Sequence, residues 1–394
     1  MKTAFVNGRV LLPEGFREHV CVVIAGDRIE AIGDGAPEGA RTVDLHGDFL
    51  LPGFIDVQVN GGGGRLFNED PSVETVAVMA EAHRRFGTTG LLPTLISDDL
   101  SVVERGVAAV EEAIETGVPG ILGIHIEGPF LSRARRGIHL ASMLQPFDDR
   151  FVELLSSAKL AKTVITVAPE CVEPAQISDL VQAGVIVCAG HSDADYETVR
   201  RAIDAGATGF THLFNGMSQL TNREPGMVGA ALENRSTYAG VIIDGQHIHP
   251  ANFRIALNAK GADRLMLVTD AMASAGSNRR EFTLQGRRIS RKGQRLMNDE
   301  GVLAGSTLTM AEAVANAAEQ GGISLASAVQ MASRTPAQFL GLADETGTIA
   351  PGLRADLLVV REDFTIVSSW IGGRASDADA IGVSAPTRSA APDR

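Results

Sequence analysis

The chain is dominated by a repeated unit in which a short apolar run is followed by a polar or glycine-rich loop and then by an amphipathic stretch. Strands that are apolar throughout are typical of a parallel sheet covered on both faces, and their alternation with helices indicates βαβ units. Eight such units predict an α/β fold with a closed (β/α)8 TIM-type barrel. The eight strand candidates are residues 53–59, 89–95, 120–127, 163–170, 184–191, 207–212, 238–244 and 264–270. The helical patterns that follow most of them are residues 72–86, 101–116, 148–160, 175–183, 193–205 and 250–259.

An open, doubly wound sheet is the alternative architecture for alternating strands and helices. Such a sheet usually carries a glycine-rich phosphate turn at the start of its first helix. The run NGGGGRLFN, residues 60–68, does not fit G-x-G-x-x-G, and the chain has neither a P-loop nor a G-x-S-x-G nucleophile elbow. The barrel is therefore the better prediction.

The two ends of the chain have a different pattern, with short apolar runs separated by turn residues. Apolar runs around Asn7-Gly8 and around Gly26-Asp27 predict two β-hairpins in the first 50 residues. Residues 347–374 also have the pattern of strands and turns. We therefore expect the two ends to close into one small accessory β domain.

An insertion and two helices lie between the last predicted barrel strand and the C-terminal β segment. Residues 281–306 have the pattern of strands and turns, and residues 306–320 and 324–342 have helical patterns. The predicted division of the chain is an accessory β domain of residues 1–50 and 343–375, a catalytic barrel of residues 51–342, and a disordered tail of residues 376–394.

The composition excludes several classes of protein. A formal net charge of −13 argues against nucleic acid or an anionic membrane as a partner, but not against a small anionic substrate. No window approaches the roughly 18 apolar residues of a membrane span. The three cysteines, Cys21, Cys171 and Cys188, form no C-x-x-C motif. This pattern predicts reduced thiols in a cytoplasmic protein, with Cys188 in the core.

Chemically capable residues stand at the ends of four predicted strands: Glu127, His191, His212 and Asp270. In a barrel of this type the active site lies at the carboxyl ends of the strands, so the four side chains should meet. Each alone has an ordinary explanation, such as a hydrogen-bonded core histidine or a helix cap. Together, Glu127, His191 and His212 form a suitable ligand set for catalytic zinc, and Asp270 could take and return a proton.

The first predicted strand lacks a ligand pair that many metal-dependent barrel hydrolases have. These enzymes end that strand in His-x-His, whereas this chain has Gln58 and Asn60 at the two places. Carboxamides are poor ligands for a borderline-soft metal. We therefore expect one divalent metal per subunit, with Zn²⁺ favoured and Fe²⁺, Co²⁺ or Mn²⁺ as alternatives.

Eight short motifs, in order along the chain, carry a resemblance to a known family. They are PGFIDVQVNGGGG, HIEGPF, AGHSDA, THLFNGM, REPGMVG, DGQHIH, LVTDAM and GSTLTM. As an ordered set they resemble the N-acetylglucosamine-6-phosphate deacetylase family of the amidohydrolase superfamily, from about residue 50 to residue 340. The resemblance implies that Glu127, His191 and His212 bind the metal, that Asp270 is the catalytic acid and base, and that His139 polarises the acetamide carbonyl.

The resemblance also implies how a phosphorylated sugar is bound. Asn215 and Gly216 match a loop that binds the sugar phosphate, and Arg223 and His247 match phosphate-binding residues. In the family the arginine comes from the neighbouring subunit, which implies a homodimer or a tetramer. Gln58, Asn60 and Met310 are further candidates for contact with substrate; for Met310, a place in a helix core is the alternative.

The function implied by the resemblance is hydrolysis of N-acetyl-D-glucosamine 6-phosphate to D-glucosamine 6-phosphate and acetate in the cytoplasm. The rivals are N-acetylgalactosamine 6-phosphate or another amide, such as a cyclic ureide, as the substrate. A third alternative is a catalytically silent binding protein with the same fold. The roles of His125 and His249 stay open, since His125 could support a ligand or simply pack, and His249 could bind metal or be exposed.

Overall fold

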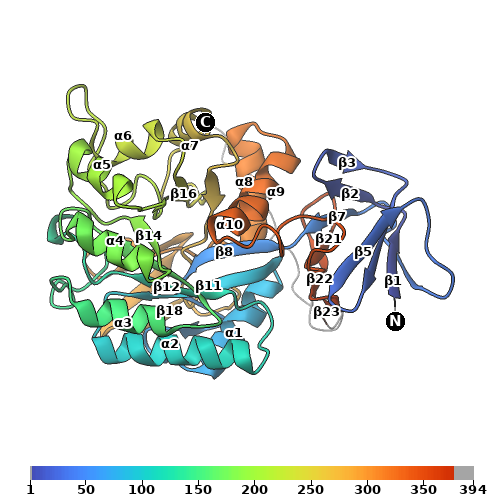
Figure 1. Cartoon of the computed structure of the whole chain (residues 1–394), viewed down its shortest axis with the longest axis horizontal. Helices are drawn as coiled ribbons and strands as arrows, with labels where there is room; N and C mark the ends of the chain where they lie inside the picture. Colours follow the sequence, from blue (N-terminus) through green and yellow to red (C-terminus); the bar gives the residue numbers. More distant parts are fainter. Residues whose placement is uncertain (1, 377–394) are drawn as a thin grey trace.

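A computed structural model describes residues 2–376, and its centre is a barrel of eight parallel strands (Figure 1). A bridge between Val59 and Ala271 and a hydrogen bond of 3.0 Å from Asp270 N to Gln58 O join the last strand to the first. The predicted (β/α)8 barrel is therefore confirmed. The strands are β8 (Phe54–Val59), β11 (Thr88–Ile96), β12 (Gly123–Glu127), β13 (Lys162–Val167), β14 (Ile186–Ala189), β15 (Gly209–Phe210), β16 (Tyr238–Val241) and β17 (Leu265–Leu267).

Helices cover the outside of the barrel, and several begin at a side-chain cap. Ser72, Asp195 and Thr309 each accept a hydrogen bond from a backbone N–H in the first turn of the helix that follows. The helices are α1 (Val73–Arg84), α2 (Leu100–Glu115), α3 (Asp149–Ser157), α4 (Pro174–Gln182), α5 (Tyr196–Asp204), α6 (Gly226–Glu233), α7 (Pro250–Lys260), α8 (Met310–Gly321), α9 (Leu325–Ala332) and α10 (Arg334–Phe339).

Two helical features differ from the sequence-based expectation. Helix α6 has no predicted counterpart, because its sequence GMVGAALE is small and apolar on nearly every side and so lacks an amphipathic period. The single helix predicted over 324–342 is two helices, since Ser333 has φ −135° and ψ −77° and interrupts the helical backbone.

The accessory β domain is built from both chain ends, as predicted (Figure 1). A four-stranded sheet, in the order β5-β4-β1-β6, contains β1 (Lys2–Val6), β4 (Cys21–Ala25), β5 (Arg28–Gly33) and β6 (Arg41–Asp44). A six-stranded sheet, in the order β23-β22-β21-β7-β2-β3, contains β2 (Arg9–Leu12), β3 (Gly15–Arg17), β7 (Phe49–Pro52), β21 (Leu357–Val360), β22 (Ile366–Ile371) and β23 (Arg374–Ala375). The predicted disordered tail begins at residue 376, and residues 377–394 lie outside the described residues.

The hairpin predicted around Asn7-Gly8 is wrong, because β1 and β2 enter different sheets. The backbone at the turn pairs with residues 45–48 rather than across a hairpin, with Gly47 N donating to Asn7 O over 2.7 Å. A Cβ on Gly8 would lie 2.7 Å from the backbone carbonyl oxygen of Asp48, so this close crossing requires glycine. The hairpin around Gly26-Asp27 is confirmed, since β4 and β5 pair antiparallel.

Large side chains from both chain ends share the core of the accessory domain. The rings of Phe5 and Trp370 meet edge to face with centroids 5.0 Å apart, and Leu50 and Leu357 pack in the same cluster. This burial of apolar surface stabilises the association of the C-terminal strands with the N-terminal ones.

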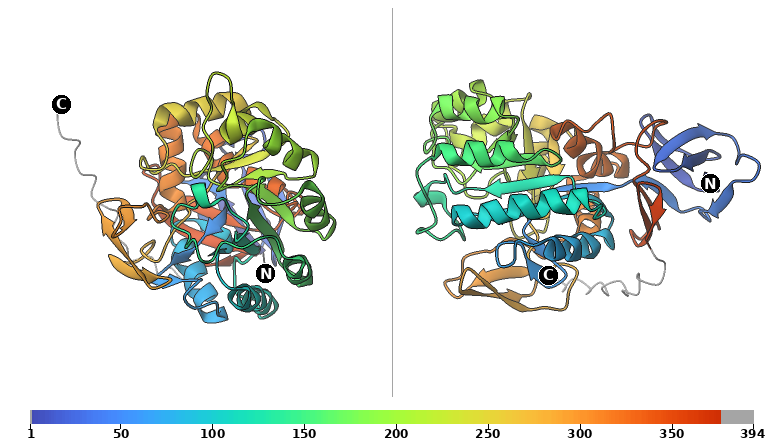
Figure 2. Two further views of the ribbon diagram at one scale, coloured as in Figure 1. Left: turned by 90° about the vertical axis from the view of Figure 1, so that its left-hand side faces the viewer. Right: turned by 60° about the horizontal axis from the view of Figure 1, so that its bottom comes forward.

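The predicted insertion forms a separate antiparallel sheet of β18 (Glu281–Leu284), β19 (Arg287–Lys292) and β20 (Arg295–Asn298). Figure 2 shows this sheet, in orange, to one side of the barrel. Its apolar face packs Phe282 and Ile289 in one cluster with Ile138 and Met272 of the barrel loops. The short strands β9 (Gly61–Gly62) and β10 (Arg65–Leu66) and the 3-10 turn Arg133–Arg135 complete the loops at this end. Within residues 2–376, no helix has the length and apolar character needed to span a membrane.

Candidate active site

The structure brings together the side chains that the sequence places at four strand ends. Glu127 Oε1 lies 3.0 Å from His191 Nε2 and 2.9 Å from His212 Nε2, and the two nitrogens are 3.0 Å apart. All four side chains are buried, and the most exposed of them, Asp270, has 9% of its surface accessible. His191, His212 and Asp270 have φ of +48°, +32° and +49°, a conformation that costs energy in residues other than glycine and is often found at functional sites.

The hydrogen bonds of His191 indicate which of its ring nitrogens faces Glu127. His191 Nδ1 lies 2.8 Å from the carbonyl oxygen of Arg135, which can only accept, so Nδ1 carries the proton of the neutral ring. In that neutral tautomer Nε2 turns its lone pair toward the Glu127 carboxylate, an arrangement in which both atoms can bind one cation. Burial alone would raise the pKa of Glu127, but its contacts with His191 and His212 hold that pKa well below the usual range. One carboxylate oxygen and two imidazole nitrogens fit a divalent metal.

His139 also lies close enough to Glu127 and His191 to form a second three-residue set. Its Nδ1 accepts a hydrogen bond from the Ser97 backbone N–H over 3.2 Å and lies 2.8 Å from Ser97 Oγ. Nδ1 is therefore an acceptor, and the proton of the neutral ring is on Nε2. Burial and the neighbouring His191 lower the pKa of His139 to about 3. A neutral ring with a proton on Nε2 can donate a hydrogen bond, whereas a metal ligand needs a lone pair at that nitrogen, so His212 is the better third ligand.

The two carboxamides of the first strand bind the carboxylates of the site. Asn60 Nδ2 donates to Asp270 Oδ1 over 2.5 Å, and Gln58 Nε2 lies 3.3 Å from the same oxygen and 3.2 Å from Glu127 Oε2. Neutral amide donors thus bridge two acidic groups. Burial and the nearby charge of Glu127 raise the pKa of Asp270 to about 6, which suits a general base near neutral pH.

One cavity of about 190 Å³ joins these groups to the predicted phosphate loop. His247 Nδ1 lies 2.7 Å from Asp244 Oδ2, which fixes the ring and leaves Nε2 available to the cavity. Asn215 Nδ2 donates to His212 O over 3.2 Å, so the phosphate loop is tied to the strand end before it. The polar lining residues are Asn60, Glu127, His139, His191, His212, Asn215, His247 and Asp270, with Gly216 beside them.

Several predicted site residues do not line this cavity. Gln58 is buried behind it, and Arg223 is exposed on the loop before α6. Contact of Met310 with substrate is not supported, since Met310 is fully buried in the main core at the start of α8, and Met272 lines the cavity instead. His249 is exposed and caps α7 through an acceptor contact with Ala251 N, away from the metal-ligand candidates.

The structure decides between the two roles left open for His125 and adds Ser97 to the site. Both ring nitrogens of His125 are used inside the barrel, by Val57 O at 3.0 Å and Thr166 Oγ1 at 2.7 Å, so it packs in the barrel rather than supporting a ligand. Ser97 directly follows β11, and the rule that active-site residues follow barrel strands could have identified it.

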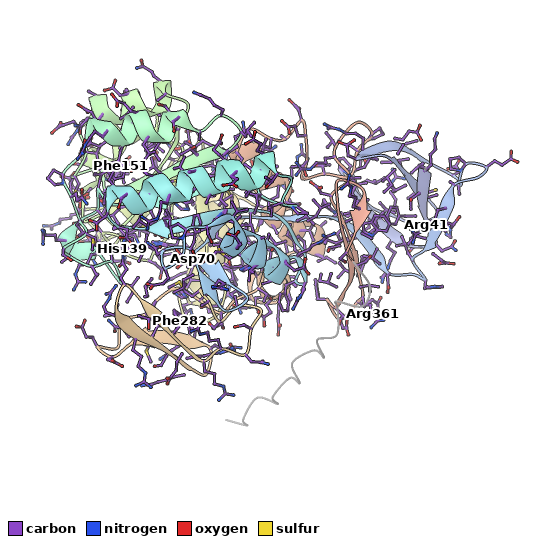
Figure 3. The ribbon with its side chains drawn as sticks, turned by 90° about the horizontal axis from the view of Figure 1, so that it is seen from below. Arg41, Asp70, His139, Phe151, Phe282 and Arg361 are labelled. Atoms are coloured by element: carbon purple, nitrogen blue, oxygen red, sulfur yellow. The ribbon has the colours of Figure 1, made fainter. Side chains whose placement is uncertain are left out.

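Figure 3 shows His139 on the same side of the barrel as Phe282 of the inserted sheet.

A further buried acid, Asp56, lies deeper in the barrel. Its Oδ2 accepts from Thr269 Oγ1 over 2.5 Å, and its Oδ1 accepts from the backbone N–H groups of Gln58 and Thr269. Burial raises the pKa of Asp56 to about 7. Asp56 therefore links β8 to the strand end that carries Asp270, and ionising it in the folded protein costs free energy.

The raised pKa of Asp56 gives a pH dependence of stability. Because the folded pKa is above the unfolded value, the folded state binds the proton more tightly, and the free energy of unfolding falls as pH rises through about 7. In Asp56→Asn this loss should be absent, so the variant should gain stability relative to wild type, on the order of a few kcal/mol between about pH 4 and pH 8. Urea denaturation of the metal-free protein measures this difference. Asp179→Asn, on an exposed position of α4, is the control. If the free energies of unfolding of Asp56→Asn and wild type differ by the same amount at every pH, the raised pKa is wrongly assigned to Asp56.

Known proteins match this chain over most of its length. A model of the amidohydrolase family matches residues 49–375. The N-acetylgalactosamine-6-phosphate deacetylase of Shewanella sp. (strain ANA-3) is 51% identical over 324 residues, which cover 82% of each protein. The N-acetylglucosamine-6-phosphate deacetylase of Haemophilus influenzae is 36% identical over 95% of this chain and 99% of its own length. The crystal structure of N-acetylglucosamine-6-phosphate deacetylase from Pasteurella multocida matches with a TM-score of 0.93 and 34% identity, over 95% of this chain and all of that one.

Proposed function

This chain belongs to the amidohydrolase family, among the N-acetylglucosamine- and N-acetylgalactosamine-6-phosphate deacetylases, and from that membership we propose that it deacetylates N-acetyl-D-glucosamine 6-phosphate. The products are D-glucosamine 6-phosphate and acetate. One observation carries the proposal: a buried Glu127–His191–His212 cluster that fits a divalent cation lies in the same cavity as Asp270 and a neutral His139. The setting is amino sugar metabolism in the cytoplasm.

One divalent metal, which we propose to be zinc, would be held by Glu127, His191 and His212, and when bound it supplies a Lewis acid and lowers the pKa of water at the site. Asp270, positioned by Asn60, accepts a proton from the attacking water and passes it to the departing amine. His139 donates its Nε2–H to the acetamide oxygen as negative charge develops there. The low pKa of His139 keeps it in the neutral form that has a fixed proton on Nε2.

The phosphate of the sugar would bind at the other side of the cavity. Asn215 and Gly216 present a loop at the end of β15, where backbone N–H groups can bind an anion. His247, oriented by Asp244, adds a donor when it is protonated. Apolar residues Ile138 and Met272 line the same cavity and offer a surface for the acetyl methyl group.

Arg223 would complete the phosphate site of a second subunit in a homodimer, or in a tetramer made of such dimers. Its loop is exposed in the single chain and also carries Leu220, an apolar residue with 56% of its surface exposed. Arg223 is absent from the lining of the cavity in its own chain. An exposed arginine beside an exposed leucine favours a contact with another molecule.

The epimeric sugar, N-acetyl-D-galactosamine 6-phosphate, is a second candidate substrate. The observation that favours it is the 51% identity with a relative named for that activity. The two sugars differ in the orientation of one hydroxyl group, while the acetamide and the phosphate are the same. The proposed chemistry therefore applies to both substrates, and a direct comparison decides which is preferred.

Metal titration with both epimers tests the proposed function. We expect the metal-stripped protein to regain acetate release as zinc is added and to saturate at about one zinc per chain, since Gln58 and Asn60 occupy the second-site positions. The ratio of kcat/KM values for the two sugar phosphates gives the preferred epimer, with N-acetylglucosamine as the unphosphorylated control. A folded, zinc-loaded protein that releases no acetate from either sugar phosphate would refute the proposal, and saturation at two zinc ions would refute the one-metal site.

Asp270→Asn tests the assignment of the base. The carboxamide keeps the size of the side chain and can still accept the hydrogen bond from Asn60, but it cannot accept the proton from water. We expect kcat to fall by about 10²–10⁴-fold while zinc per chain stays unchanged, as measured by acetate release and metal analysis. Retention of more than a tenth of wild-type kcat would show that another group is the base.

Arg223→Ala tests the proposed contact with phosphate across subunits. Removing a charge-assisted hydrogen bond to the substrate should raise KM about 10- to 100-fold for the phosphorylated sugar, with a much smaller effect on the unphosphorylated one. Arg105→Ala, on the exposed face of α2, is the matched control and should leave KM unchanged. An equal loss with both sugars would argue against the phosphate role.

A further inference from the structure

The first turn of the inserted sheet reaches back to the barrel and contacts the loop after β11. Gln285, between β18 and β19, has φ +48°, and its backbone N–H donates to Glu69 Oε1 over 2.6 Å. Its side-chain Nε2 donates to the carbonyl oxygen of Ser97 and to Asp98 Oδ2, each over 2.8 Å. The Ser97 carbonyl oxygen and the ionised Asp98 carboxylate can accept hydrogen bonds but cannot donate them. The Gln285 side chain must therefore direct its NH2 group, and not its oxygen, toward them.

The loop that Gln285 contacts is held from its other side by Asn68. Asn68 Nδ2 donates to Ile96 O over 3.1 Å and to Asp98 Oδ2 over 3.0 Å, and Asn68 Oδ1 accepts from Ile96 N. Ile96 O and Ser97 N belong to one planar peptide, and Ser97 O belongs to the next. Asn68 therefore orients the peptide before Ser97, and Gln285 orients the peptide after it.

Ser97 is the residue that selects the tautomer of His139. Its N–H donates to His139 Nδ1 over 3.2 Å, and its hydroxyl lies 2.8 Å from the same nitrogen. Ser97 and His139 each have 1% of their surface exposed, so water does not compete for these contacts. If the peptides around Ser97 rotate, Nδ1 loses its donor, and the ring proton is no longer confined to Nε2.

We propose that Gln285 is a positioning residue, which acts through Ser97 to hold His139 in the tautomer that donates from Nε2 to the substrate. The inserted sheet is then part of the catalytic apparatus, since its turn secures a histidine on a different loop of the barrel. The role rests on the proposed function, in which His139 stabilises the developing negative charge. The contact is a direct one between residues 188 positions apart in the sequence.

Kinetics of two variants and a control test the proposal with the zinc-loaded protein. Gln285→Ala removes the donor, and Gln285→Glu keeps the size but replaces the amide donor by a carboxylate that faces Asp98 and Ser97 O. Both should lower kcat about 10- to 100-fold with KM changed less than about two-fold. The reason is that the hydrogen bond from His139 stabilises the transition state and not the bound substrate. Gln294→Ala, in the next turn of the same sheet, should retain wild-type kcat, since Gln294 contacts Arg291 and Thr307 instead. Wild-type kcat in Gln285→Ala would overturn the proposal.

A double-mutant cycle separates an effect through His139 from a general loss of structure. In a His139→Asn background, adding Gln285→Ala should lower kcat no further, because the group it positions is already absent. A second, equal loss of kcat in that background would show that Gln285 acts elsewhere. Zinc per chain and the melting temperature of each variant are measured alongside.

A spectroscopic measurement is independent of turnover. In zinc-loaded protein with ¹⁵N-labelled histidine, His139 should show one protonated nitrogen, Nε2, and this signal is assigned by its loss in His139→Asn. In Gln285→Ala the signal should change to that of a mixture of tautomers, and in Gln294→Ala it should not. An unchanged signal in Gln285→Ala would overturn the proposal even if neither sugar phosphate proved to be a substrate, so the two failures can be told apart.

Discussion

The contact of one Glu127 oxygen with two buried imidazole nitrogens is the interaction on which the rest of the site depends. In its neutral form His191 turns a lone pair toward that oxygen, because its other nitrogen donates to the Arg135 carbonyl. One carboxylate oxygen and two imidazole nitrogens in contact at a buried site fit a divalent metal. The surrounding residues hold these three side chains in place at the wall of the cavity.

The first barrel strand places two carboxamides beside the acids of the site. Glu127 and Asp270 are buried acids whose negative charges repel. Gln58 and Asn60 direct amide N–H groups at the two carboxylates and offset part of this repulsion. Hydrogen bonds stabilise the charged form less than a full cation does, and the pKa of Asp270 accordingly stays raised, at about 6. The two carboxamides of the first strand therefore leave Asp270 suited to proton transfer.

Apolar packing and hydrogen bonds together hold the inserted sheet against the barrel. Burial of Phe282 and Ile289 against Ile138 and Met272 stabilises the sheet on the barrel without fixing its register. Hydrogen bonds are directional, and those of Gln285 to Ser97 and Asp98 fix the position of the β18–β19 turn relative to the loop after β11. The accessory β domain lies at the other end of the barrel and packs N-terminal against C-terminal strands (Figure 1). None of its described residues lines the cavity.

The sequence by itself determined the barrel and the four strand-end residues, because both depend on local apolar period and on the rule that parallel strands end at one rim. It failed where neighbouring segments decide the outcome, since Asn7-Gly8 joins two sheets instead of closing a hairpin. For Met310 it left two places open, and the structure puts the side chain in the core. Only the tertiary structure decided the protonation of His139. The tautomer of a ring depends on which donors and acceptors surround it, and Ser97 and Gln285 come from distant parts of the chain that pattern alone does not bring together.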